Sequence, residues 1–315
     1  MDQQGMPGRQ RGLEGTQVLG RSSNRVIAHE VKARAIGAYL WGMNKEGSMN
    51  QGAADPAHQG IVITGASSGI GEALALEAAR RGHPLILLAR RLDELDRVAQ
   101  LCLAQGSPRC QTLHLDLANN DSIQDCARQI LALGWPLHGL INNAGISQRS
   151  TARNADPNSE LHLMQVNYLG PVLLTKHLLP ALPSGGGILI ISSVVGLFPF
   201  PQRSSYAASK HALHGYFETM ALEEKSRLRI TIACPGRVRT NISLNALASD
   251  GRSHNTMDPG QVGGLDPTHC ARLIWSAWHA NRRRVLVARG EKILWWLYRF
   301  IPSLFDRVAL RVSPV

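Results

Sequence analysis

Short runs of apolar residues alternate with longer amphipathic stretches over most of the chain, from Gly60 to about residue 290. Short apolar runs between turn residues are typical of strands that are buried on both faces. The runs predict strands at 61–63, 84–89, 110–115, 137–141, 187–191, 229–234 and 284–288. The stretches between them predict helices at 72–81, 92–105, 121–133, 157–180, 206–226 and 267–280. Because strands and helices alternate throughout, we expect an α/β fold with a doubly wound parallel sheet in a single domain.

The two ends of the chain do not follow this alternation. Residues 1–59 are rich in Gly, Gln, Asn and Arg, and they predict a disordered N-terminal extension with a short helix over 27–42. A translation start at Met49 would leave the domain of residues 60–290 complete, so we expect the extension to be dispensable. Residues 291–315 predict an amphipathic C-terminal tail that is both aromatic and basic.

The composition suits one large soluble domain or two small ones, because 44% of the 315 residues are hydrophobic and 18% are charged. The formal net charge is +11, and residues 271–315 alone carry nine lysines and arginines against two acidic residues. A basic balance is compatible with nucleic acid, an anionic membrane surface or an anionic ligand. The basic residues lie outside any nucleic-acid-binding motif, so we expect no nucleic-acid partner.

The cysteines, histidines and apolar segments argue against a disulfide-linked, metal-binding, secreted or membrane-spanning protein. The five cysteines are scattered without a CxxC pair, which predicts buried thiols in a reducing compartment. The twelve histidines show no metal-binding spacing, and we expect no metal. Residues 1–24 lack the apolar run of a secretory signal, and the apolar stretch 293–305 is too short to span a bilayer. We therefore expect a cytoplasmic protein, which is peripheral at a membrane if the tail binds lipid.

A glycine-rich turn lies between the first predicted strand and the first predicted helix. It reads TGASSGIG at 64–71. Its glycines let the backbone turn tightly and approach a pyrophosphate, whose charge is stabilised at a helix N-terminus. The spacing GxxxGxG differs from that of the commonest dinucleotide-binding motif, so a plain glycine turn is the alternative. The position between a strand and a helix favours a dinucleotide site.

The residues that follow the second and third strands bear on the choice of cofactor. An acidic residue after the second strand binds the ribose hydroxyls of NAD, whereas an arginine suits the 2′-phosphate of NADP. Here Arg90 and Arg91 follow the strand and the first acid is Asp93, which favours NADP(H) over NAD(H). A solvated start of the next helix is the alternative. Asp116 follows the third strand, where it either accepts a hydrogen bond from an adenine amino group or caps a loop.

The segment SSYAASK at 204–210 carries a tyrosine and a lysine four residues apart. In a helix Tyr206 and Lys210 share one face, so the ammonium lies one turn from the phenol. A nearby positive charge favours tyrosinate, and we expect the pKa of Tyr206 to fall from about 10 towards neutrality. Such a phenol serves as a general acid or base for a ketone or an alcohol. A surface helix with a chance Tyr/Lys pair is the alternative.

Together these motifs resemble those of the short-chain dehydrogenase/reductase family. The resemblance covers roughly residues 60–290. The motifs are TGASSGIG at 64–71, NNAG at 142–145, Asn167, the Ser-Ser pair at 192–193, YAASK at 206–210 and PGRVRT at 235–240. The resemblance implies a Rossmann fold and an NADP(H)-dependent oxidoreductase that transfers a hydride between the nicotinamide and a carbonyl or secondary alcohol. A non-catalytic dinucleotide sensor or scaffold on the same fold is the alternative.

The same resemblance implies roles for individual residues. Tyr206 is the general acid/base, Lys210 lowers its pKa and holds the nicotinamide ribose, and Ser193 orients the substrate oxygen. Asn167 supports the active-site backbone and a water that leads to the lysine, and Thr240 faces the nicotinamide carboxamide. The implied cofactor-binding residues are Gly65, Ser67, Ser68, Gly69, Ile70, Gly71, Arg90, Asp116, Asn143, Ala144, Gly145, Tyr206, Lys210, Pro235, Gly236, Val238 and Thr240.

The sequence leaves the substrate, the partners and the role of the tail open. We expect a small-molecule carbonyl or alcohol substrate and, by the resemblance, a homo-oligomer formed through the 157–180 and 206–226 helices. Residues 241–266 are polar and glycine-rich, as in a mobile lid. The aromatic and basic tail predicts packing over the substrate pocket or a neighbouring subunit, or burial of 293–305 in an anionic membrane surface.

Overall fold

The computed structural model describes residues 59–311. The predicted N-terminal extension, its short helix and the start at Met49 lie outside the described residues. The division of the chain into an extension, a central domain and a tail stays a prediction.

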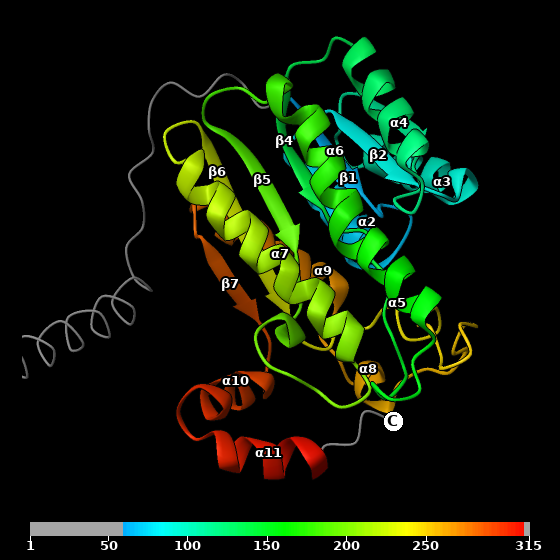
Figure 1. Cartoon of the computed structure of the whole chain (residues 1–315). Helices are drawn as coiled ribbons and strands as arrows, with labels where there is room; N and C mark the ends of the chain where they lie inside the picture. Colours follow the sequence, from blue (N-terminus) through cyan, green and yellow to red (C-terminus); the bar gives the residue numbers. More distant parts are fainter. Residues whose placement is uncertain (1–58, 312–315) are drawn as a thin grey trace, which may run out of the picture. The chain divides into compact units, whose positions relative to one another are not determined.

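A seven-stranded parallel sheet forms the centre of the described chain, in the order β3-β2-β1-β4-β5-β6-β7 (Figure 1). The strands are β1 (Gly60–Thr64), β2 (Leu85–Ala89), β3 (Cys110–His114), β4 (Leu137–Asn142), β5 (Gly186–Ile191), β6 (Leu228–Pro235) and β7 (Arg284–Val287). This confirms the predicted doubly wound parallel sheet. The strand order reverses between β1 and β4, which is where ligands bind in folds of this kind.

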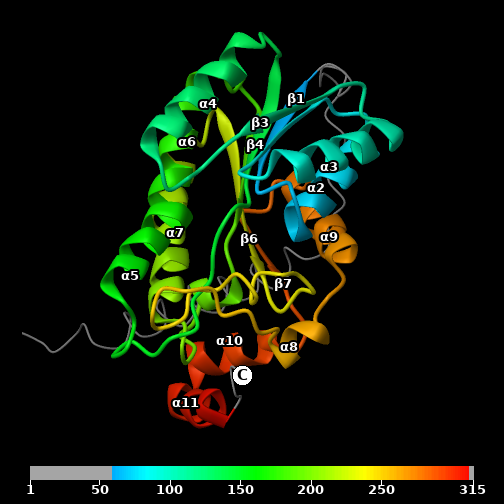
Figure 2. The same ribbon diagram turned by 90° about the vertical axis from the view of Figure 1, so that its right-hand side faces the viewer.

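Helices cover both faces of the sheet, and Figure 2 shows the two layers separately. One layer consists of α2 (Gly69–Ala79), α3 (Leu92–Ala104) and α9 (Pro267–His279). The other consists of α4 (Asn120–Ala132), α6 (Gly170–Leu178) and α7 (Ser204–Glu223). The side chains of β1 alternate between the layers, since Ile61 and Ile63 join the core under α2 and α9 whereas Val62 joins the core under α4, α6 and α7. Burial on both faces explains why the strands are continuously apolar.

The predicted helix over 157–180 is wrong in one respect, because it is not a single α-helix. It consists of α5 (Pro157–Met164), a π-helical segment Gln165–Leu169, α6 and a 3₁₀ turn Leu179–Ala181. Pro171 has no N–H to donate to the carbonyl of Asn167 four residues earlier, and its ring crowds that carbonyl. The helix therefore widens just before the proline, as π-helical turns do at functional sites.

The C-terminal residues form two helices rather than one continuous segment. Helix α10 (Glu291–Phe300) ends before Pro302, and α11 (Pro302–Arg311) begins at that proline, which suits the first position of a helix. Figure 1 shows this helix pair beyond the carboxyl end of β7. The segment 241–266, which was expected to be a lid, is irregular apart from α8 (Pro259–Val262).

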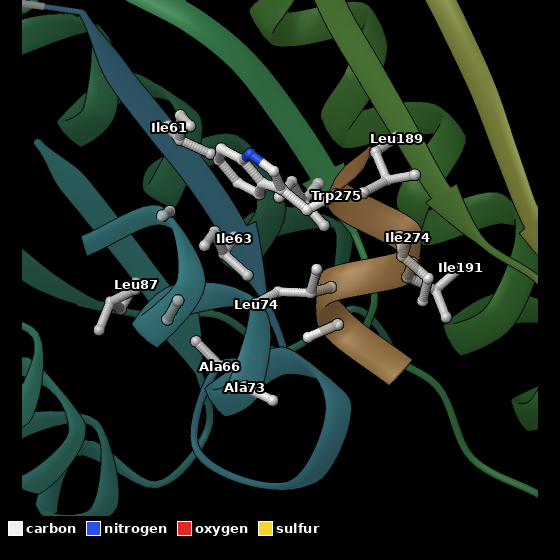
Figure 3. Packing of buried hydrophobic residues seen from close by; sticks show 14 of the residues in the cluster. Ile61, Ile63, Ala66, Ala73, Leu74, Leu87, Leu189, Ile191, Ile274 and Trp275 are labelled. Atoms are coloured by element: carbon white, nitrogen blue, oxygen red, sulfur yellow. The ribbon is translucent and has the colours of Figure 1, made fainter. Parts of the chain in front are cut away.

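A tryptophan anchors α9 against the sheet. The Trp275 side chain is 1% exposed and lies in one cluster with Ile61 and Ile63 of β1 and Leu189 of β5 (Figure 3). Its indole also stacks on the His279 ring with a centroid distance of 4.6 Å. A large buried aromatic side chain contributes strongly to stability because its removal leaves a cavity.

We expect Trp275→Ala to lower the free energy of unfolding by about 3–5 kcal/mol, because the surrounding core cannot fill the space of an indole. Urea denaturation followed by circular dichroism measures the change. The matched control is Trp296→Ala, which removes an indole that is 54% exposed and should cost less than about 1 kcal/mol. Equal losses in the two variants would contradict the packing described for Trp275.

Candidate active site

The loop between β1 and α2 has a backbone that only glycine permits. Gly65 and Gly69 have φ angles of +65° and +62°, in the left-handed region that side chains disfavour. At Gly71 a Cβ atom would lie 2.1 Å from the Gly65 carbonyl oxygen. The loop therefore closes on itself tightly and leaves the first N–H groups of α2 at its open end, as expected for a phosphate-binding turn.

Hydrogen bonds join this loop to the end of β4. The Asn143 side-chain amide donates to the carbonyl oxygens of Thr64 at 3.0 Å and Gly65 at 3.2 Å. In return the Thr64 hydroxyl accepts from the backbone N–H groups of Asn143 at 2.9 Å and Ala144 at 3.0 Å. These bonds hold the NNAG segment against the glycine turn at the point where the strand order reverses.

The adenosine-side candidates lie at the ends of β2 and β3. Arg90 and Arg91 are exposed, and the Arg91 guanidinium donates to the Ser67 hydroxyl at 3.4 Å, so it reaches the glycine loop. The Asp116 carboxylate accepts from the Ala118 N–H at 2.9 Å, which is the loop-capping role that the sequence left open. Asp116 also lines the cavity described next, so capping does not remove it from the site.

A cavity of about 720 Å³ at the carboxyl ends of the strands brings the predicted residues together. It is lined by every predicted catalytic and cofactor-binding residue except Gly71 and Asn167. Gly71 does not line the cavity, but its lack of a side chain lets the loop close on itself. Asn167 acts from behind the cavity wall, since its side chain accepts from the Ile146 N–H at 2.8 Å and donates to the Ile146 carbonyl at 2.9 Å and to Ser209 at 3.0 Å. Asn167 thus supports the backbone beside the cavity.

Tyr206 and Lys210 lie on α7, and both side chains are buried in the cavity wall. The Lys210 ammonium donates to the Ile191 carbonyl at the end of β5 at 3.0 Å, and its nitrogen lies 5.8 Å from the centre of the Tyr206 ring. Burial lowers the pKa of Lys210 to about 8. The lysine therefore stays within one helical turn of the phenol, as the spacing predicted.

The prediction that the pKa of Tyr206 falls towards neutrality is wrong for this structure. Burial raises the pKa, because the phenolate would lose its hydration, while the Ser193 hydroxyl and the charges of Arg149 and Arg203 lower it. The Lys210 ammonium is held on a backbone carbonyl and is not among the groups that shift the tyrosine. The Tyr206 phenol is therefore protonated at neutral pH, and the charges of Arg149 and Arg203, which were not among the predicted site residues, act against the effect of burial.

These arginines belong to a buried group, the arginine cluster, which we define as Arg149, Arg203 and Asp258. The Asp258 carboxylate accepts from Nε of Arg149 at 3.0 Å and from Nη2 of Arg149, and it also accepts from Nη2 of Arg203 at 3.2 Å. The exposed fractions of the three side chains are 4%, 9% and 13%. The cluster joins the segment after β4, the start of α7 and the segment before α8, and all three members line the cavity.

Only one of these residues gave a signal in the sequence. Arg203 lies three residues before Tyr206 and one before the first serine of the SSYAASK segment, so its proximity in sequence could have marked it. Arg149 and Asp258 lie 109 positions apart, and no spacing rule connects them. Gln148 was missed as well, although its side-chain oxygen accepts from the Ser205 N–H at 2.9 Å and thereby fixes the start of α7.

The comparisons with known proteins agree with this site. The sequence model of the family described as short chain dehydrogenase matches residues 59–250. A curated relative from Anopheles gambiae, a dehydrogenase/reductase SDR family protein 7-like protein, is 38% identical over 253 residues, covering 78% of this chain and 80% of the relative. The chain belongs to the short-chain dehydrogenase family. As a member of this family it is an oxidoreductase.

Two solved structures are similar to this dehydrogenase in fold. An alcohol dehydrogenase from the archaeon Thermococcus sibiricus, complexed with 5-hydroxy-NADP, has a TM-score of 0.62 and 26% identity and covers 73% of this chain and 95% of its own. A short-chain dehydrogenase/reductase from Burkholderia phymatum, in complex with NAD, has a TM-score of 0.66 and covers 84% of this chain and 98% of its own. The latter is 23% identical and shows the fold alone.

The C-terminal helices of the dehydrogenase pack on the active-site wall through one face. Phe305 and Ala309 of α11 are buried in a cluster with Val194, Phe198 and Tyr206. The Glu291 carboxylate at the start of α10 accepts from the Arg237 N–H at 2.9 Å and so ties the tail to the PGRVRT segment. These contacts agree with the expectation that the tail packs over the pocket.

The described part of the dehydrogenase also bears on the expectations about the cysteines and about a membrane span. Cys102, Cys126, Cys234 and Cys270 are buried, whereas Cys110 is half-buried, so the predicted burial is confirmed for four of the five cysteines, and the reducing compartment stays a prediction. No helix within residues 59–311 is long and apolar enough to cross a bilayer.

We expect Asp258→Asn to lower the free energy of unfolding by about 3–5 kcal/mol, because it leaves two buried guanidinium groups without their shared counter-ion. Urea denaturation at neutral pH measures the loss. Asp250→Asn in the same segment is the control, since its partner Arg252 is 88% exposed and the pair should contribute less than about 1 kcal/mol. A small loss for Asp258→Asn would show that the cluster is solvated.

Proposed function

We propose that this dehydrogenase transfers a hydride between NADP(H) and a carbonyl or secondary alcohol, with Tyr206 as the general acid/base. The observation that carries the proposal is the convergence of Tyr206, Ser193 and Lys210 with the glycine loop on one cavity. Hydride transfer to a carbonyl leaves charge on its oxygen, and hydroxyl groups and cations already in position stabilise that charge. When bound, the nicotinamide would supply or accept the hydride.

The side chains then have distinct tasks in the reduction of a carbonyl. Ser193 donates a hydrogen bond to the substrate oxygen and orients it, and Tyr206 donates the proton that this oxygen takes up. Because burial raises its pKa, the phenol carries its proton near neutral pH, and the reduction of a carbonyl requires that proton. Arg149 and Arg203 stabilise the phenolate that remains.

The residues that would hold the dinucleotide fit it in shape and charge. The left-handed glycines and the start of α2 suit a pyrophosphate, and Asp116 lies at the end of β3 where an adenine would lie. Arg90 and Arg91 support the choice of NADP(H) over NAD(H), because a guanidinium binds a phosphate through two parallel hydrogen bonds. The relative from Thermococcus sibiricus was solved with an NADP derivative, which agrees with this choice.

We also propose a homo-oligomer and a peripheral membrane contact. Leu161 of α5, Leu169 before α6 and Leu222 of α7 are exposed on the helices that the family resemblance implies as subunit contacts. The cytoplasmic location expected from the sequence stays a prediction.

The membrane contact is supported by the outer face of the C-terminal helices. Seven of the sixteen large apolar side chains that are exposed in the described part of the chain lie between residues 293 and 310. Ile293, Trp296 and Phe300 follow helical spacing on one face of α10, and the Trp296 and Phe300 rings are 4.7 Å apart. Lys292 and Arg299 are exposed on the same helix. An apolar stripe with flanking cations favours an anionic bilayer surface.

We expect Tyr206→Phe to abolish NADPH-dependent turnover, by at least about a thousandfold, because the variant has no proton to donate. Binding of NADPH should change by less than about threefold, since the ring remains in place. Stopped-flow absorbance and fluorescence titration measure the two quantities. Full activity of the variant would refute the assigned mechanism, and loss of both activity and binding would indicate misfolding instead.

We expect the double variant Arg90→Ala, Arg91→Ala to weaken NADPH binding about tenfold or more, because the 2′-phosphate loses charge-assisted hydrogen bonds. Binding of NADH should change by less than about twofold. Fluorescence titration yields both dissociation constants, and Arg272→Ala on α9 is an exposed control. If the binding of NADPH and NADH weakened equally, or if neither changed, these arginines would not be the NADP determinant.

We expect the wild-type protein to float with vesicles of phosphatidylserine and phosphatidylcholine. The double variant Trp296→Ser, Phe300→Ser should partition about tenfold less, because the side chains that enter the interface are lost. Leu101→Ser, Leu103→Ser on α3 is the matched control, since these side chains are 42% and 40% exposed. Equal flotation of the two double variants would remove the support for membrane contact through α10.

A further inference from the structure

We propose that the arginine cluster is a subsite for an anionic substituent, a carboxylate or a phosphate, carried by the carbonyl substrate. The inference deepens the proposed reductase function and rests on it. It starts from the place of the cluster, because Arg149 and Arg203 line the same cavity as Tyr206 and act on its phenol. A group bound there lies beside the reacting carbonyl.

The cluster has one more positive charge than its own carboxylate can balance. Two guanidinium groups, with side chains 4% and 9% exposed, share Asp258. Burial and the neighbouring Arg149 lower the pKa of Arg203 to about 9, and the charge of Arg237 acts in the same direction. A buried charge without a counter-ion is costly, so an anion that enters the cavity gains from an attraction that water does not screen.

The other carboxylates nearby are bonded elsewhere. Glu160 accepts a hydrogen bond from the Ser205 hydroxyl. Glu291 accepts from the backbone N–H groups of Arg237 and Arg289. Within residues 59–311, Asp258 is the one acid in an ion pair with either arginine of the cluster. The excess positive charge therefore faces the cavity rather than a second protein carboxylate.

Arg203 is the member of the cluster that retains donors for a ligand. Arg149 uses Nε and Nη2 for Asp258 and Nη1 for Ser147 and the Gln148 carbonyl. Arg203 uses Nη1 for the Gln202 carbonyl and Nη2 for Asp258, and its Nε makes no hydrogen bond within the described residues. Arg149 thus holds the carboxylate in place, and Arg203 offers its remaining N–H to the cavity.

The walls of the cavity define the rest of the substrate class. Val194, Val195, Phe198 and Phe200 line the cavity together with Tyr206 and the arginines. The phosphates of a dinucleotide would be met by the glycine loop and by Arg90 and Arg91, so the cofactor does not account for the cluster. These features point to a ketone or aldehyde with an apolar body and one carboxylate or phosphate.

The experiment compares three aryl ketones that differ in one substituent: 4-acetylbenzoate, 4-acetylphenyl phosphate and the neutral 4-acetylbenzamide. Binding to the protein saturated with NADP⁺ is measured by calorimetry, and kcat/KM is measured with NADPH. We expect at least one anion to bind about tenfold more tightly than the amide, and kcat/KM to follow the same order. The stronger of the two anions identifies the substituent.

Arg203→Gln should abolish this preference, with anion binding falling about tenfold and amide binding changing by less than about twofold. Arg203→Lys keeps the charge and should retain part of the preference. Arg153→Gln, an exposed arginine in the segment after Arg149, should leave the preference unchanged. If Arg203 had a purely structural role, its loss would weaken the binding of all three ketones equally, and the ratio of their affinities would not change.

Equal binding of the anions and the amide by the wild type, or an unchanged preference in Arg203→Gln, would overturn the subsite. Turnover of the amide without preference for the anions would overturn the subsite alone and leave the reductase function intact. If none of the three ketones showed Tyr206-dependent turnover, the result would count against the reductase function. The ratio of anion to amide affinity, measured by calorimetry, would then still decide the subsite.

Discussion

The exchange of hydrogen bonds between Thr64 and Asn143 is the contact on which the active site depends. It joins the ends of β1 and β4, where the strand order reverses, and it fixes the glycine turn against the NNAG segment. Because all seven strands are parallel, their carboxyl ends meet at one edge, and the residues that follow them line one cavity. A shift of β4 along β1 would move both walls of that cavity at once.

Most of the fold could be predicted because buried parallel strands leave a plain pattern in the sequence. The seven predicted strands match the observed ones to within one or two residues, since each is an apolar run between turn residues. The helix over 157–180 was the main error. Residues 165–169 are as compatible with an α-helix as their neighbours, and the wider turn arises from the effect of Pro171 on the residues before it.

The candidate site also contains a part that could be predicted from the sequence and a part that could not. The glycine loop, the NNAG segment and the Tyr/Lys pair are local motifs, and the structure places all three around one cavity. The arginine cluster is not local, because Asp258 meets its partners across 109 and 55 positions of sequence. The expected fall in the pKa of Tyr206 was wrong for a related reason. Spacing along a helix describes the neighbouring lysine, whereas burial depends on everything that packs around the phenol.

The π-helical turn between α5 and α6 has a consequence for how this family member can change in evolution. It holds one residue more per turn than an α-helix, and that residue brings the Asn167 amide onto both backbone groups of Ile146. Loss of a single residue from this turn would restore ordinary helical winding and rotate the asparagine by about 100° around the helix axis. The position of the Asn167 amide therefore depends on the number of residues in this turn.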